Sequence, residues 1–301
     1  MLDLNMQHTK YRRYSQHGEE GIVDAFIGCV YSESERSSLL ACEFGAHDGS
    51  NSNLLKIVED GSSFGVFIEC DKSRFDIFSE SYSHLANSKV INGKVGWEKD
   101  NDLAAIFRLH GLAIDNLKIL SIDIDGDDAH ILENMSYSID LVLIEYNPTF
   151  GFDTEFCNPK GSSIGSSPKT LAKIASTKSL FLAAVTETNL IFVNKKFEGL
   201  IRKYDLREIE PCASATRYAM GYDGTLVVVD GKGTDLTNEI IGVGWSKSFF
   251  LQPTPRVIRR FDEFGKTRLV YSLFVLLVTR PFAVFALCRK IVKYKTKKQS
   301  V

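Results

Sequence analysis

Continuous apolar runs alternate with helical stretches through much of the chain, and this pattern predicts a parallel sheet. The apolar runs cover residues 39–44, 64–69, 89–95, 117–125 and 141–147. The stretches between them carry apolar residues at the spacing of an amphipathic helix. A strand that is covered on both faces is apolar throughout, and strands that alternate with helices form a doubly wound sheet. The pattern therefore predicts an α/β fold with a mostly parallel sheet.

Two further apolar runs, 179–185 and 189–194, are separated only by Thr186, Glu187 and Thr188. So short a link cannot hold a crossover helix, so the two runs must form an antiparallel hairpin. Together with the five runs before them, they predict a seven-stranded, Rossmann-like sheet that ends in this hairpin.

Acidic and amide side chains stand at the ends of the strongly apolar runs. They are Glu43, Glu69, Asp123, Asp125, Glu145 and Asn147. In an open α/β sheet, ligands bind outside the carboxyl ends of the strands, where these side chains should converge. The segment 148–169 follows, and its Gly, Ser and Pro content is typical of a mobile loop. We therefore place the chemistry at this edge, with 148–169 as a candidate substrate lid.

A glycine loop follows the first strand, with Gly45 and Gly49 where the backbone must turn tightly or approach a ligand. A helix then begins near Ser52 or Asn53, and its amide end favours anionic or electron-rich groups. Glu69 lies about 20 to 25 residues past the loop, the spacing at which a carboxylate reaches ribose hydroxyls in Rossmann-like folds. These features together predict a nucleotide-type cofactor.

Composition narrows the class of protein. The 301 residues are 44% apolar and 25% charged, as in globular proteins, and the formal charge of -2 argues against general nucleic-acid binding. The six cysteines include no CxxC pair, so neither a disulfide framework nor a zinc ribbon is supported. Cysteines of this kind fit a reducing, cytoplasmic setting best. The first residues also lack the apolar core of a secretory signal.

Three motifs, EFGAHDG, FIECD and LSIDIDGDD, resemble the first, second and fourth motifs of the FkbM-type methyltransferases. The order of the predicted strands, with the final hairpin, looks like the class I S-adenosylmethionine-dependent methyltransferase fold. The resemblance covers residues 14–195. It implies an enzyme that uses S-adenosylmethionine as cofactor, with O-methylation of a saccharide or other polyhydroxy acceptor as the expected reaction.

The resemblance also implies roles for single residues. The cofactor residues that it implies are Glu43, Gly45, Ala46, Gly49, Glu69 and Asp123. The loop residues among them would line the methionine and ribose part, Glu69 would hold the ribose hydroxyls, and Asp123 would lie beneath the reacting sulfonium. The chain departs from the family pattern in having Cys70 after Glu69 where the family has Pro, and Asp125 in place of Glu. These departures concern the substrate more than the cofactor.

Methyl transfer requires an aligned nucleophile and a base that removes its proton, and a carboxylate or a His is the natural base. The candidates are Asp125, Glu145 and His130. Oxygen ligands at neighbouring strand ends would also suit Mg²⁺, with Asp123 or Asp125 joined by Glu145 and Asn147. We do not favour a bound metal on the sequence alone.

Other interpretations of the same residues stay open. The Asp-Ile-Asp triplet at 123–125 could be the metal-binding DxD motif of a nucleotide-sugar glycosyltransferase. A catalytically silent module could keep the fold as an interaction surface. Acids at strand ends also often cap the next helix, a role open to Asp127 or Asp128. The glycine spacing does not match the GxGxxG of NAD-binding folds, which disfavours a dehydrogenase.

The chain is expected to comprise a methyltransferase domain at 1–198, a β-containing extension at 199–265 and an apolar, basic tail at 266–301. In the extension, apolar stretches flank Asp223-Gly224, a strong turn dipeptide, and predict a second hairpin. In the tail, 268–298 combines an apolar stretch with a basic end. It would contact the inner face of a membrane as an interfacial helix, or else pack on the domain.

Overall fold

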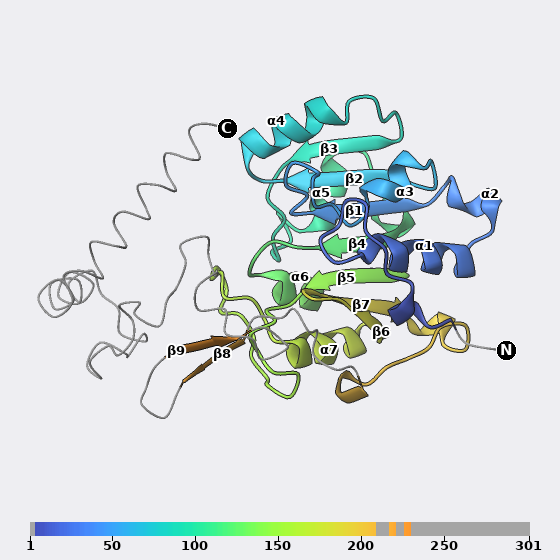
Figure 1. Cartoon of the computed structure of the whole chain (residues 1–301). Helices are drawn as coiled ribbons and strands as arrows, with labels where there is room; N and C mark the ends of the chain where they lie inside the picture. The colour runs from blue at the N-terminus through green and yellow to red at the C-terminus, as the bar shows by residue number, and fades with distance from the viewer. Residues whose placement is uncertain (1–3, 209–216, 221–225, 230–301) are drawn as a thin grey trace, which may run out of the picture. The chain divides into compact units, whose positions relative to one another are not determined.

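The computed structural model describes residues 4–208, 217–220 and 226–229 (Figure 1). The chain divides into two units, Met1–Cys212 and Ala213–Val301. In the second unit, β8 (Arg217–Met220) and β9 (Leu226–Val229) pair antiparallel, which confirms the predicted second hairpin. The turn at Asp223-Gly224 and the tail at 266–301 lie outside the described residues.

A seven-stranded sheet forms the centre of the first unit, in the order β3-β2-β1-β4-β5-β7-β6. The strands are β1 (Leu40–Phe44), β2 (Phe64–Glu69), β3 (Ser88–Asn92), β4 (Leu117–Ile122), β5 (Leu141–Glu145), β6 (Leu180–Val185) and β7 (Asn189–Asn194). Strands β1 to β5 run parallel, whereas β7 is antiparallel to both β5 and β6. This order and polarity are those of the class I S-adenosylmethionine-dependent methyltransferase fold, and they confirm the predicted hairpin.

Helices cover both faces of the sheet (Figure 1). The α-helices of the described residues are α1 (Glu19–Val30), α2 (Glu33–Arg36), α3 (Leu55–Glu59), α4 (Lys72–Ser81), α5 (Leu103–Leu109), α6 (Asp128–Asn134) and α7 (Pro168–Thr177), of which all but α2 bury residues against the sheet. Short 3₁₀ helices occupy Met6–His8, Ile114–Asn116, Lys195–Phe197 and Leu206–Glu208. One core packs α1, α3 and α4 on the sheet, and the other packs α5, α6 and α7 on the opposite face. The doubly wound architecture is therefore confirmed.

Successive residues of β1 show why each central strand is apolar throughout. Ala41 belongs to the core beneath α1 and α3, whereas Cys42 and Phe44 belong to the core beneath α5 and α6. Side chains of a strand alternate between the two faces, so a strand buried on both faces has no polar side. All five residues of β1 are buried.

Strand β4 is shorter than the apolar run that predicts it, and it ends level with β1. Ile122 pairs with Phe44 of β1 and with Ile144 of β5, near the last residues of those strands. Beyond this point Asp125 adopts a positive φ of 58°. Residues 123–125 therefore leave the sheet and form the turn into α6.

We predict that Gly45→Ala destabilises the protein far more than Gly61→Ala does. Both glycines have positive φ, +78° and +73°, so both substitutions carry backbone strain of about 1–2 kcal/mol. A Cβ at Gly45 would lie 1.4 Å from the carbonyl oxygen of Asp123, whereas one at Gly61 meets nothing within 4 Å. Overpacking should raise the cost of Gly45→Ala to about 3 kcal/mol or more.

Urea denaturation of the two variants measures the difference. Equal losses of unfolding free energy would contradict the close packing of the glycine loop on the end of β4.

Candidate active site

A cavity of about 370 Å³ opens at the carboxyl ends of β1, β2, β4 and β5, the edge where the sequence predicts the chemistry. Five of the six predicted cofactor residues line it, namely Glu43, Gly45, Ala46, Glu69 and Asp123. Two predicted catalytic residues, Asp125 and Glu145, line it as well. The parallel strands thus bring into one cavity side chains that lie about a hundred residues apart in the sequence.

Glu69, at the end of β2, joins the glycine loop to the start of α4. Its Oε2 accepts the backbone N–H of His47 at 2.8 Å, and its Oε1 accepts that of Asp71 at 2.7 Å. The side chain is buried, at 4% exposure. A carboxylate has about four acceptor positions, of which the two N–H groups take two, and the thiol of Cys70 is a third, weak donor beside it. Glu69 therefore suits a pair of hydroxyls such as those of a ribose.

Glu43 builds the turn that follows the glycine loop. It accepts the hydroxyl of Ser52 and the backbone N–H groups of Asn53, at 2.8 Å, and Leu54, at 3.3 Å. Burial raises the pKa of Glu43 to about 7, against the lowering effect of these three donors. Ser52 Oγ in turn accepts the N–H of Leu55 at 2.9 Å. Helix α3 begins at Leu55 with Leu54 as its N-cap, just past the predicted Ser52 or Asn53.

The two glycines of the loop have different reasons to be glycine. Gly45 lines the cavity and lies against the backbone of Asp123. Gly49 does not line the cavity, and a Cβ there would lie 2.5 Å from the ring of Tyr82 and 2.9 Å from that of Phe78. The structure thus puts Gly49 in the packing between the loop and α4 and not at the cavity, so its predicted cofactor contact is not found.

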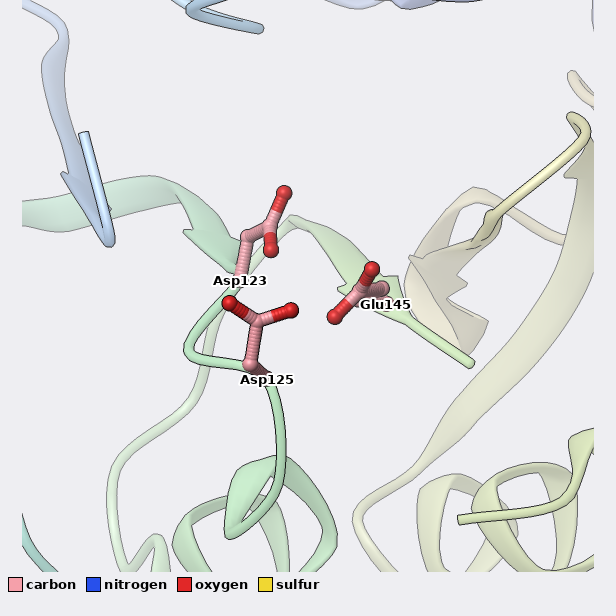
Figure 2. A group of neighbouring side chains, drawn as sticks. All are labelled: Asp123, Asp125 and Glu145. Atoms are coloured by element: carbon pink, nitrogen blue, oxygen red, sulfur yellow. The ribbon is translucent and has the colours of Figure 1, made fainter. Parts of the chain in front are cut away.

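Three carboxylates converge at the ends of β4 and β5. Figure 2 shows Asp123 and Asp125 where β4 runs into its loop, with Glu145 of β5 beside them. Oxygens from all three lie within 4.8 Å of one another. We call Asp123, Asp125 and Glu145 the carboxylate cluster.

A fourth acid, Asp128, shapes the turn that holds the carboxylate cluster. Its carboxylate accepts the N–H of Ile124 at 3.0 Å and of Gly126 at 2.9 Å. Asp128 therefore holds the turn before α6 and does not cap the helix, whose N-cap is Asp127, without a side-chain cap hydrogen bond. Asp123 and Asp125 are left for the cavity.

Burial raises the pKa of both Asp123 and Glu145, and the negative charges of Asp125 and Asp128 raise both further. No salt bridge in the described part of the chain involves a member of the carboxylate cluster. An arrangement of this kind can take up a proton or hold a cation.

His130, the third predicted catalytic residue, is not brought to the cavity. It lies in α6, with Nε2 2.7 Å from the carbonyl oxygen of Asn158 and its ring 5.9 Å from that of Trp97. A carbonyl only accepts, so Nε2 is the protonated nitrogen. The ring is thus engaged between α6 and the loop that follows β5.

The predicted lid loop contributes Gly161, Ser162 and Ser163 to the cavity wall. Asn158, only 1% exposed, determines its shape, because its amide donates to Ser162 O at 2.8 Å and accepts from Ile164 N at 3.1 Å. Asn147, considered above as a metal ligand, binds this loop instead of the cavity. Its Nδ2 donates to the carbonyl of Ile164 at 2.6 Å.

Sequence reasoning missed Asn189 and Glu19. Asn189 is the first residue of β7, lines the cavity and pairs directly with Glu145 across the antiparallel strands. Its Nδ2 donates to Glu19 Oε1 at 3.1 Å, and the hydroxyl of Thr186 donates to the same oxygen at 2.5 Å. The sequence shows Asn189 directly after the three-residue link at 186–188, so its place at a strand end could have been noticed. That Asn189 lies opposite Glu145 follows only from the pairing of β5 with β7.

No family model matches the chain, and no curated protein matches its sequence. Similar solved structures include the N-terminal domain of EvdMO1 with SAH bound, at 8% identity over 60% of this chain and 82% of that chain, with a TM-score of 0.41. The citrinin polyketide synthase CMeT domain is 14% identical over 58% of this chain and 50% of that chain, with a TM-score of 0.42. Fibrillarin of Aeropyrum pernix with natively bound S-adenosyl-L-methionine is 10% identical over 55% of this chain and 69% of that chain, with a TM-score of 0.38.

The EvdMO1 domain holds SAH, and the fibrillarin holds S-adenosyl-L-methionine. The fold assignment stands on the strand order itself.

Among the residues that the structure describes, none of the helices has the length and apolar character needed to cross a membrane. The tail at 266–301, for which we predict membrane contact, is not among those residues.

We predict opposite effects on stability for two matched Asp→Asn substitutions in the β4–α6 turn. Asp125→Asn removes a like charge from the carboxylate cluster, and Asn tolerates its positive φ, so unfolding free energy should hold or rise by about 0.5 kcal/mol. Asp128→Asn weakens the acceptor for two backbone N–H groups and should cost about 1–3 kcal/mol.

Both variants can be compared with the unaltered chain by urea denaturation in buffer with EDTA. A loss of the same size in both would contradict the separation of structural from cavity carboxylates.

Proposed function

We propose that this protein is an S-adenosylmethionine-dependent methyltransferase of the FkbM type, which methylates a hydroxyl oxygen of a saccharide or related polyhydroxy acceptor. One observation supports this most: in a sheet of the methyltransferase strand order, Glu69 and the carboxylate cluster line the same cavity. Glu69 suits the hydroxyls of a ribose, and the carboxylate cluster suits a reacting hydroxyl of the acceptor.

The residues at the cavity fit the cofactor. S-adenosylmethionine, when bound, supplies a methyl group on a positively charged sulfur. Glu69 has free acceptor positions for the ribose hydroxyls. Gly45 and Ala46 offer a wall without bulky side chains. Asp123, which also belongs to the carboxylate cluster, would present one of its two oxygens to the sulfonium.

Transfer requires the acceptor oxygen to lie in line with the methyl carbon. The bound cofactor would supply that carbon and would leave with the electron pair on its sulfur, so the protein's own residues must align the acceptor oxygen and take up its proton. The hydroxyl proton must leave, and we assign its acceptor to Asp125, the exposed member of the carboxylate cluster. Glu145, half-buried beside it, would orient the hydroxyl.

We predict that Glu69→Gln weakens binding of S-adenosylmethionine at least tenfold, because an amide keeps one acceptor oxygen and adds a donor that faces the backbone N–H groups. Glu80→Gln, an exposed change on the neighbouring helix α4, is the matched control and should bind as the unaltered chain does. Isothermal titration calorimetry measures both, and equal affinities would count against the cofactor assignment.

Calorimetric titrations with S-adenosylmethionine and with a nucleotide sugar also distinguish the methyltransferase from a glycosyltransferase and from a catalytically silent module. Binding of a nucleotide sugar in place of S-adenosylmethionine would favour a glycosyltransferase whose DxD motif is the pair Asp123 and Asp125. Binding of S-adenosylmethionine without turnover on any polyhydroxy acceptor would favour a silent module.

We also propose peripheral membrane contact through residues 268–298, on the ground of their apolar and basic sequence. The full chain should float with anionic vesicles, and a chain that ends at Gly265 should not. Equal flotation of the two would contradict this contact.

A further inference from the structure

We propose that Asp123, Asp125 and Glu145, with Oδ1 of Asn189 as a fourth ligand, bind a divalent cation of the Mg²⁺ or Mn²⁺ type. We further infer that this cation binds two oxygens of the acceptor; this second inference rests on the proposed function.

The carboxylate cluster has the chemistry and the compactness of such a site. Its oxygens lie within 4.8 Å of one another and come from the ends of two hydrogen-bonded parallel strands, so the backbone holds them in place (Figure 2). Carboxylate oxygens are the ligands that Mg²⁺ and Mn²⁺ prefer. No Lys or Arg in the described ranges forms a salt bridge with these carboxylates, so their charge is left for another cation.

Asn189 supplies an independent observation. It is 4% exposed, and its Oδ1 is a buried acceptor without a hydrogen-bond donor. The orientation of the amide is determined by Glu19, a buried carboxylate that can only accept and therefore holds Nδ2, at 3.1 Å. Oδ1 is thus the end of the amide that is left for the cavity.

The position of Asn189 connects this unpaired oxygen to the carboxylate cluster. Asn189 and Glu145 are direct partners in the antiparallel pair of β7 and β5, and both line the cavity. Side chains of directly opposed residues project from the same face of a sheet, with Cβ atoms about 5 Å apart. A buried polar atom without a partner is unfavourable. A cation beside Glu145 would give Asn189 Oδ1 the partner that it lacks.

Such a cation defines the class of acceptor. Mg²⁺ takes about six oxygen ligands in octahedral geometry, so four protein oxygens leave about two positions. A vicinal diol fills two adjacent positions as a chelate. Coordination also lowers the pKa of a bound hydroxyl. With the cation bound, Asp125 acts as a ligand instead of the proton acceptor, so the proton leaves to solvent while the oxygen bonds to the methyl carbon and the sulfur leaves with the electron pair. The cation itself is unchanged by the reaction.

Electron paramagnetic resonance of Mn²⁺ tests the site without reference to activity. The full chain, freed of metal with EDTA and dialysed, is titrated with Mn²⁺, and we expect one bound ion per chain that excess Mg²⁺ displaces. Asp125→Asn and Glu145→Gln should each weaken Mn²⁺ binding at least tenfold. Asp125 is exposed and Asn suits its positive φ, so this variant keeps the fold.

Asp127→Asn is the matched control. Asp127 lines the same cavity two residues beyond Asp125, but its Oδ1 accepts the N–H of Gly161 at 2.9 Å and it is outside the carboxylate cluster. Its Mn²⁺ affinity should stay within about twofold of the unaltered chain. Absence of Mn²⁺ binding by the unaltered chain, or equal weakening by Asp125→Asn and Asp127→Asn, would overturn the site.

Calorimetry with S-adenosylmethionine on the same samples separates this inference from the proposed function. Cofactor binding without Mn²⁺ binding overturns the cation site alone. Mn²⁺ binding without cofactor binding overturns the methyltransferase proposal and the inference about the acceptor, and it leaves the cation site supported.

Discussion

The contact between the glycine loop and the end of β4 is the constraint on which the cavity depends. Gly45 lies so close to the carbonyl oxygen of Asp123 that no other residue fits without a shift of the backbone. The N–H of Gly45 donates to Ile68 O at 3.1 Å, and the N–H of Asp123 donates to Phe44 O at 3.2 Å. The ends of β1, β2 and β4 are therefore held together at one edge. Glu69 and the carboxylate cluster face the same cavity because of this packing.

Acidic residues around this cavity divide into two groups by what they accept. Glu43, Glu69 and Asp128 accept backbone N–H groups, and each holds a turn in place. In the described part of the chain, no backbone N–H donates to Asp123, Asp125 or Glu145. Glu43, Glu69 and Asp128 thus hold the backbone of the site in place. The carboxylate cluster keeps negative charge that a ligand, a proton or a cation must balance.

Backbone-level predictions agree closely with the structure, and the reason is local. Short apolar runs without polar interruptions predict strands that are buried on both faces of a sheet. The three-residue link at 186–188 is too short for a helix between β6 and β7, so these strands form a hairpin. Glu69 and Asp123 reach the cavity because every parallel strand ends at the same edge. Such features need no knowledge of which strands are neighbours.

The amino-acid sequence by itself determined the order of strands and helices, the closing hairpin and the edge that carries the acids. Only the tertiary structure decided which side chains meet there. It turned His130 and Asn147 toward the loop after β5, and it brought Asn189 opposite Glu145 with an oxygen unpaired. The physical reason is that side-chain direction and cross-strand register depend on pairing between segments that are remote in the chain.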